Sequence, residues 1–222
     1  MRTTRIWDLP TRLFHWMLAA LVVALVVSGS IGGNAMVWHF RFGYGVLSLL
    51  LFRIVWGLVG GRWSRFSSFM YAPVTVWAYL HGERRPEHDA GHSPLGALSV
   101  LALLVMLMAQ VTAGLLSDDE IAFAGPLTRY VSSATVSLAT IYHTEVGKLI
   151  LIGLVLVHIM AIFFYRWKMK DDLIRPMICG DKEMPAALAI EGSRDDAGSR
   201  LLAAMIFAAC AGLVAWLARL GG

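Results

Sequence analysis

Four histidines lie in long apolar stretches of the sequence or at their ends: His15, His39, His143 and His158. An imidazole ring is costly to bury in hydrocarbon, so a histidine at such a position usually faces other helices and has a task there. Binding a haem iron is one task that fits, because neutral imidazole is a strong axial ligand and the porphyrin is itself apolar. The other histidines, His81, His88 and His92, fall in a polar stretch, where exposure to solvent is the simpler interpretation.

The apolar stretches have the length of membrane-spanning helices. The chain has 222 residues, 58% of them hydrophobic and 15% charged, whereas a soluble domain of this size carries more charge. About 20 apolar residues cross a bilayer, and the stretches that approach this length are 13–31, 39–59, 93–116, 140–165 and 201–217. We therefore predict an all-α fold: a transmembrane four-helix haem-binding bundle with an additional fifth C-terminal transmembrane helix.

Local signals mark where these segments begin and end. Asp8 and Pro10 precede the first stretch, and Ser93-Pro94 opens the third, as expected for helix starts. The residues 181–200 are polar and several are small, which indicates a linker. The predicted parts are a transmembrane dihaem domain at 1–180, a polar linker at 181–200 and a C-terminal transmembrane helix at 201–222. Pro73 could start a short helix in the headgroup region, and a plain loop is an equally good interpretation.

The basic residues of the short connections predict the orientation in the membrane. On the side of the N-terminus lie Arg2, Arg5, Arg12, Arg62, Arg65, Arg84, Arg85, Arg166, Lys168, Lys170 and Arg175. The opposite side has only Arg41 and Arg129, beside the acidic run 118–120. We expect a cytoplasmic N-terminus in the cytoplasmic (inner) membrane of a bacterium. The net charge of +4 therefore needs no nucleic acid as partner.

With this orientation the four histidines match in depth as two pairs. His15 and His158 fall near the cytoplasmic face, and His39 and His143 near the outer face. Fifteen residues separate the two histidines of the fourth helix, about 22 Å along a regular α-helix, and at about 100° per residue they point to the same broad side. Two bis-histidine haems stacked across the bilayer fit this pattern. For each histidine alone, a structural hydrogen-bonding role is the competing interpretation.

Arginines near both predicted haem sites could bind haem propionates, which need cationic or backbone donors near water. Arg12 is close to the inner site and Arg41 to the outer site. Arg53, on the second helix, could reach the inner propionates or extend to the lipid headgroups. The sequence has no C-x-x-C-H motif, so covalent c-type attachment is excluded, and Cys179 and Cys210 have the character of ordinary residues.

These residues together resemble a known pattern, that of the bacterial cytochrome b561 family, whose superfamily includes the b-type cytochrome subunits of nickel–iron hydrogenases. The resemblance rests on His15-Trp16, on His39-x-x-x-Gly43 with Arg53 ten residues further, and on His143 with His158. The stretches 7–12, 53–57 and 91–94 add to it, and it covers about residues 5–180. It implies two haems b ligated by the four histidines, and electron exchange between a membrane quinone and a redox partner.

The resemblance leaves the partner and the precise activity open. The partner could be a periplasmic c-type cytochrome or a hydrogenase, and a stand-alone superoxide:quinone oxidoreductase is an alternative. The acidic run 118–120 could face a basic cytochrome, and pairing of two copies as a homodimer is a further hypothesis. From another class, a proton-coupled transporter could use the same histidines as relay groups, but the discontinuous helices and inverted repeats typical of transporters are not evident.

Overall fold

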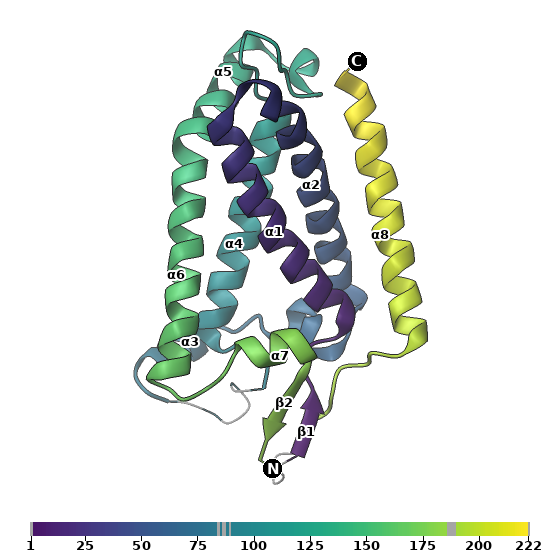
Figure 1. The fold of residues 1–222 in the computed structure, drawn as a ribbon. Coiled ribbons are helices and arrows are strands. Elements are labelled where there is room, and N and C mark those ends of the chain that lie inside the picture. Colours follow the sequence, from purple (N-terminus) through teal and green to yellow (C-terminus); the bar gives the residue numbers. More distant parts are fainter. Residues whose placement is uncertain (1, 84, 86–87, 89, 186–189, 222) are drawn as a thin grey trace. The chain divides into compact units, whose positions relative to one another are not determined.

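The computed structural model describes residues 2–83, 85, 88, 90–185 and 190–221, so Arg84 and the predicted linker's residues 186–189 lie outside the described residues. Within the described part, five helical stretches are long and apolar enough to cross a membrane (Figure 1). They contain α1 (Leu9–Ile31), α2 (Met36–Val59), α4 (Pro94–Leu115), α5 with α6 (Ser133–Ile141 and Lys148–Trp167), and α8 (Ala197–Ala218). The five predicted spans are confirmed, and the chain is a multi-pass membrane protein.

Polar side chains set the starts of these helices. Asp8 accepts a hydrogen bond from the Thr11 N–H at 2.8 Å, and Ser93 accepts one from the Gly96 N–H at 3.2 Å. Both bonds satisfy amides that would otherwise have no partner in the first helical turn. The fourth span begins at Ser133, earlier than predicted, because Ser132 caps it through the Thr135 N–H at 3.3 Å. Its first turns are too rich in Ser and Thr to stand out by hydropathy.

The fourth span is not a uniform α-helix. Between α5 and α6 the residues Tyr142–Gly147 form a π-helical segment, which contains His143. A π-helix has a wider turn than an α-helix, so the count of 100° per residue does not hold between His143 and His158. The prediction that the two histidines point to the same side assumed a regular α-helix, and this assumption was wrong.

A small antiparallel sheet joins the two ends of the family-like region. Strand β1 (Arg2–Arg5) pairs with β2 (Asp181–Met184), with Arg5 opposite Asp181 (Figure 1). Strand β2 follows α7 (Ile174–Cys179), a helix that ends at Gly180, whose φ is 92°. The Gly180 carbonyl accepts hydrogen bonds from the N–H groups of Ile6 and Trp7. The sequence did not predict this sheet, since part of it was interpreted as linker. Four-residue polar strands carry no alternating apolar pattern.

The chain folds as two compact units, and each unit contains a segment of every long helix. The first unit comprises 1–14, 53–102 and 156–204, and the second 15–52, 103–155 and 205–222. In the first, Ile6, Trp7, Ala90 and Met184 form a buried cluster. In the second, the core cluster consists of Val46, Leu50, Leu107 and Leu151.

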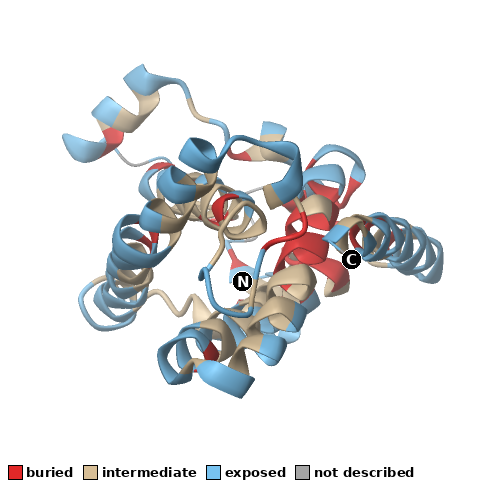
Figure 2. Ribbon diagram, turned by 90° about the horizontal axis from the view of Figure 1, so that it is seen from above, coloured by how far each residue is buried: buried red, intermediate tan, exposed pale blue. Residues whose placement is uncertain are grey.

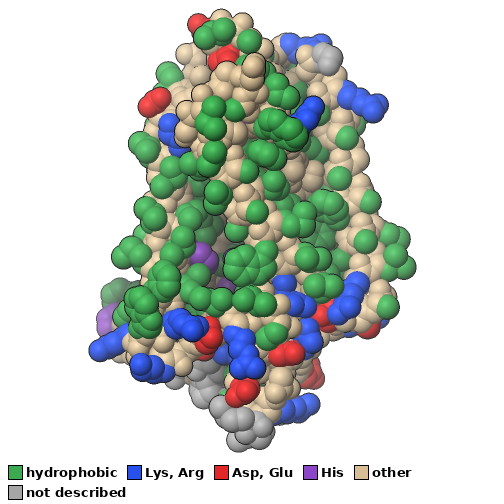
Figure 3. All heavy atoms as spheres, viewed as in Figure 1, with side chains coloured by type: hydrophobic (Ala, Val, Ile, Leu, Met, Phe, Trp, Pro, Cys, Tyr) green, Lys and Arg blue, Asp and Glu red, His purple; other side chains and the backbone are tan. Residues whose placement is uncertain are grey.

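Many apolar side chains of the long helices are exposed rather than buried, as Figure 2 shows for most turns of α8. Val23, Leu58 and Leu149 each expose more than half of their surface. On the face drawn in Figure 3 most side chains along the helices are apolar, and many of the charged ones lie near the strands. Apolar exteriors of this extent are expected where lipid surrounds the helices.

A short helix, α3 (Pro73–Leu80), occupies the stretch for which helix and loop were equal expectations. Val74 and Trp77 on it are 72% and 65% exposed, whereas Tyr79 is buried. The Tyr79 hydroxyl lies 3.0 Å from that of Tyr165 on α6. The helix thus exposes an apolar face and anchors the opposite face to the first unit, as an interfacial helix would.

Asp195 connects the N-terminal segment to the start of α8 in the first unit. Its carboxylate lies 2.9 Å from Arg200 and 3.3 Å from Arg5, with Arg12 at 3.9 Å. Burial alone would raise the pKa of Asp195, but hydrogen bonds from Arg200 and the Leu9 N–H, with the charges of Arg200 and Arg5, hold it below its usual range.

We expect Asp195→Asn to destabilise the first unit by about 1–3 kcal/mol at neutral pH, because charge-assisted hydrogen bonds are lost. A lowered pKa means that the stabilisation is present above the unfolded pKa of about 3.9 and disappears as pH falls through the folded value. Thermal unfolding of both proteins in detergent between pH 3 and 8 checks this. A difference that persists unchanged at pH 3 would contradict it.

Candidate functional site

His39 and His143 face one another in the second unit. His39 lies in the first turn of α2, His143 in the π-helical segment, and their ring centroids are 6.0 Å apart with the ring planes at 89°. The structure therefore brings together two of the four histidines that the sequence paired with one another.

Each of these rings is oriented through its Nδ1 atom. His39 Nδ1 lies 3.1 Å from the Leu25 carbonyl oxygen, and His143 Nδ1 lies 2.9 Å from the Gln110 carbonyl oxygen. A carbonyl only accepts, so Nδ1 donates the proton in both rings and Nε2 keeps its lone pair. Histidines that bind metals generally donate their other ring N–H in this way.

Glycines leave room for both rings. A Cβ on Gly29 of α1 would lie 3.1 Å from His39 Cε1, and a Cβ on Gly114 of α4 would lie 2.8 Å from His143 Cε1. Gly45 instead packs against Leu21, since a Cβ at this glycine would lie 3.1 Å from that side chain.

The donors fit a haem iron held by two imidazoles. With metal–nitrogen bonds of about 2 Å, two imidazoles on opposite sides of one metal have their centroids roughly 6 Å apart. The observed separation agrees, the protonated Nδ1 atoms leave Nε2 for the metal, and the surrounding helices are apolar enough for a porphyrin.

His15 and His158 belong to different units, His15 to the second and His158 to the first. Both are half-buried. The His15 ring packs edge-on against Trp16, with centroids 5.0 Å apart, while His158 lies within α6. Their pairing on one iron stays a prediction.

The three arginines considered for propionates have different surroundings. Arg41 is exposed, and its guanidinium lies 4.9 Å from the centroid of the Trp38 ring. Arg12 donates to the Ile178 carbonyl and lies near Asp195. Arg53 is only 3% exposed, so the interpretation that it extends to the headgroups is wrong.

Arg53 belongs to a buried polar cluster of the first unit. It donates to the Ser64 carbonyl at 3.0 Å and lies 4.9 Å from the centroid of the Phe66 ring. The Ser64 hydroxyl donates to Asp8 at 2.7 Å, and Trp56 Nε1 is 3.3 Å from both Asp8 oxygens. Asp8, fully buried, thus joins the start of α1 to α2 and the loop after it. The sequence had shown Asp8 only as a helix start.

Two of the three remaining histidines pack in the first unit, contrary to the expectation of solvent exposure. His88 is 6% exposed and its ring lies against Tyr71 and Tyr79, with centroids 5.4 and 5.6 Å away. His92 packs between Trp7 and Phe69. Because this loop is polar in composition, the sequence did not indicate that aromatic side chains pack against these two histidines. His81 is exposed, as expected.

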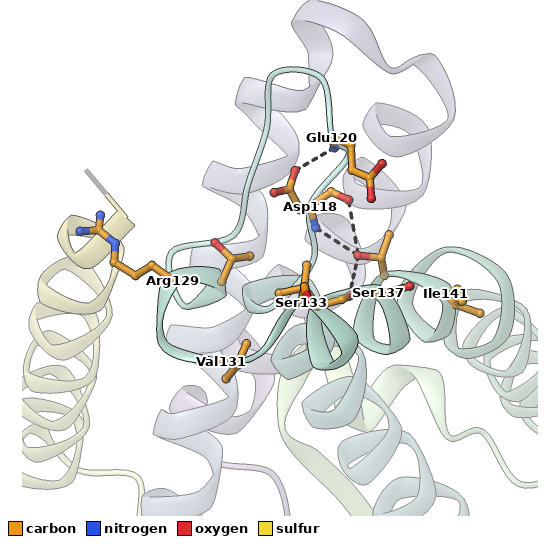
Figure 4. A pocket seen from close by; sticks show the side chains of 10 residues that line it. Asp118, Glu120, Arg129, Val131, Ser133, Ser137 and Ile141 are labelled. Carbon is orange, nitrogen blue, oxygen red and sulfur yellow. Dashed lines mark hydrogen bonds between the residues drawn. The ribbon is translucent and has the colours of Figure 1, made fainter.

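Asp118 and Glu120, the two ends of the acidic run 118–120, line a pocket of the second unit together with Arg129 (Figure 4). Asp118 Oδ1 accepts from the Glu120 N–H at 2.8 Å, and the Asp118 N–H donates to Thr140 at 3.1 Å. Hydrogen bonds from the N–H groups of residues 123, 122 and 121 lower the pKa of Asp119. The carboxylates of Asp118 and Asp119 thus order the loop. Asp119 and Glu120 are exposed, and Asp118 is half-buried.

Two neighbouring imidazoles whose Nδ1 atoms bond to main-chain carbonyls, in a protein of apolar spanning helices and without a c-type attachment motif, are what the class of membrane b-type cytochromes requires. These are electron-transfer proteins whose prosthetic group is haem b. The chain belongs to the prokaryotic cytochrome b561 family, whose model matches residues 6–180. The resemblance seen in the sequence is thereby confirmed.

Relatives of the chain include hydrogenase-associated cytochromes. A probable Ni/Fe-hydrogenase 1 B-type cytochrome subunit of Escherichia coli (strain K12) is 27% identical over 137 residues, 49% of this chain and 57% of the relative. A probable Ni/Fe-hydrogenase B-type cytochrome subunit of Azotobacter vinelandii is 29% identical over 129 residues, 46% and 53% of the two chains. One of Bradyrhizobium diazoefficiens is 24% identical over 216 residues, 82% and 86%. The chain thus spans little more than half of the first two relatives, and no solved structure matches it significantly.

Proposed function

We propose that the chain is a dihaem cytochrome of the bacterial inner membrane that transfers electrons between the quinone pool and a periplasmic redox partner. The opposed pair of His39 and His143 carries this proposal, because the distance between the rings and the bonds of both Nδ1 atoms suit axial ligands of one haem. His15 and His158 would ligate the second haem. This second pair is supported by the sequence, in which both histidines fall at a similar depth of the membrane.

When bound, haem supplies a one-electron change between ferric and ferrous iron. The chain's own residues orient the ligands and keep water away from the haem. The carbonyls of Leu25 and Gln110 fix the tautomers of the two outer histidines, and the apolar helices exclude water. Arg41, exposed near the outer pair, is placed to offer a cation to carboxylates at the membrane surface.

The direction of insertion follows from the basic connections. Excess arginine and lysine on the side of β1 and α7 supports a cytoplasmic N-terminus, which puts the His39–His143 pair near the periplasm. A periplasmic hydrogenase or c-type cytochrome would then exchange electrons with the outer haem. The relatives, described as probable Ni/Fe-hydrogenase B-type cytochrome subunits, favour a hydrogenase as this partner. A homodimer stays a prediction.

Electron exchange with quinol tests this function directly. We expect a short-chain ubiquinol or menaquinol, added to the oxidised protein without air, to reduce haem b, seen as the rise of the reduced α-band. Oxidised c-type cytochrome, or hydrogenase under hydrogen, should then exchange electrons with the same haem. Protein that keeps its haem but neither accepts electrons from quinol nor returns them to quinone would contradict the proposal. Reduction by superoxide alone would favour the stand-alone alternative.

A further inference from the structure

Gln110 on α4 holds His143 at two points. Its main-chain carbonyl accepts from the imidazole Nδ1–H at 2.9 Å, and its side-chain Nε2 donates to the main-chain carbonyl of His143 at 2.8 Å. One residue thus fixes both the ring and the backbone of this histidine. A single bond to the ring would leave the backbone free to shift.

The side-chain bond also fixes the orientation of the Gln110 amide. The carbonyl of His143 can only accept, so the NH₂ group must face it. The amide oxygen Oε1 is then buried, and no partner for it lies among the described residues. An unsatisfied buried oxygen is unfavourable, so stability alone does not explain an amide at this place in an apolar helix.

The side-chain hydrogen bond of Gln110 ends on the π-helical segment that contains His143. Short π-helical segments are rare and occur frequently at functional sites, and here the segment Tyr142–Gly147 carries the histidine itself. Gly147, buried at its end, leaves space for the Gln110 amide, because a Cβ at this position would overlap Oε1. The widened turn and the amide therefore fit one another.

The same face of α4 shapes the surroundings of the ring one turn further on. Gly114, four residues after Gln110, lies where a Cβ would approach His143 Cε1 to 2.8 Å. We propose that Gln110 is a positioning residue for the outer haem: with Gly114 it makes α4, which donates no ligand, the element that sets the orientation of the His143 imidazole. This inference rests on the proposed function, since it requires His143 to be a haem ligand.

The angle between the two imidazole planes, 89°, provides a spectroscopic readout. Ferric bis-histidine haems with nearly perpendicular ligand planes give a highly anisotropic low-spin EPR signal, and more parallel planes give a rhombic one. Gln110→Leu keeps the main-chain carbonyl that accepts from Nδ1 and removes only the side-chain bond to the His143 backbone. Loss of an outer-shell contact that orients a ligand typically weakens metal binding by about 10–100-fold. Neither the EPR signal nor the strength of haem binding depends on electron-transfer activity.

The test compares Gln110→Leu with wild-type protein by EPR and by transfer of haem to excess apo-myoglobin. The signal that is absent from His39→Ala identifies the haem concerned. We expect Gln110→Leu to move this signal towards the rhombic form and to release the haem at least about tenfold faster. Met108→Leu, a swap of similar volume on the same helix, serves as the matched control and should change neither readout.

Gly114→Ala provides a second variant if Gln110→Leu does not fold, because it removes no polar group and acts on the ring by contact. It should change the same EPR signal. Wild-type signal and wild-type haem retention in a folded Gln110→Leu protein, or in Gly114→Ala where it alone folds, would overturn the inference. Absence of haem from the wild-type protein would instead overturn the proposed function.

Discussion

Replacing His143 by alanine is expected to lower the haem content from two haems b per chain to one. The imidazole is an axial ligand in this account, and a haem left with His39 alone has lost one of its two protein bonds to iron. His39→Ala should have the same effect, because both residues serve the same iron. The pyridine haemochrome assay on purified protein, with protein quantified by amino-acid analysis, measures the ratio.

His81→Ala is the matched control for these two variants. His81 is exposed and follows the last residue of α3, where its ring bonds to the Trp77 carbonyl of that helix. Its loss should therefore leave both haems in place. Added imidazole should restore part of the haem to His143→Ala, since it can enter the space of the lost ring. Two haems retained in either His39→Ala or His143→Ala would show that the pair does not ligate haem.

Replacing Asp8 by alanine is expected to destabilise the protein by about 3–5 kcal/mol, the usual loss when one partner of a buried charged cluster is removed. The variant removes the carboxylate that accepts from the Ser64 hydroxyl and from Trp56 Nε1. It also removes a negative charge that acts on buried Arg53. It also removes the cap of α1. Thermal unfolding of the haem-loaded protein in detergent, followed by circular dichroism, gives the comparison.

Two further variants separate these contributions. Glu183→Ala changes an exposed acid of the first unit and should unfold like the wild-type protein. Asp8→Asn keeps a cap acceptor but loses the charge, so its unfolding temperature should fall between those of wild type and Asp8→Ala. An Asp8→Ala protein that unfolds at the wild-type temperature would show that the buried cluster contributes no stability.

The spanning helices could be predicted from the sequence because each of their signals is local. Apolar length marks a span, and Asp8 and Ser93 mark starts through bonds to residues three positions further on. The depth of each histidine also follows from its position in its own helix. The juxtaposition of His39 and His143 therefore needed only helix length and orientation.

The rest of the site depends on contacts that spacing does not encode. The partners of Asp8 lie 48 and 56 residues away, and strand β1 pairs with residues near the other end of the family match. Gln110 offered one signal, since an amide within an apolar span is costly, but its partner on another helix was not visible. The π-helical segment has no sequence pattern that distinguishes it from an α-helix.

Haem stoichiometry, combined with a reduced-minus-oxidised spectrum of the purified wild-type protein, shows whether the chain is a dihaem cytochrome. We expect two haems b per chain, with b-type bands and low-spin bis-histidine EPR signals. One haem per chain would contradict ligation of the second haem by His15 and His158. A well-folded protein that takes up no haem at all would contradict the assignment of His39 and His143 as ligands.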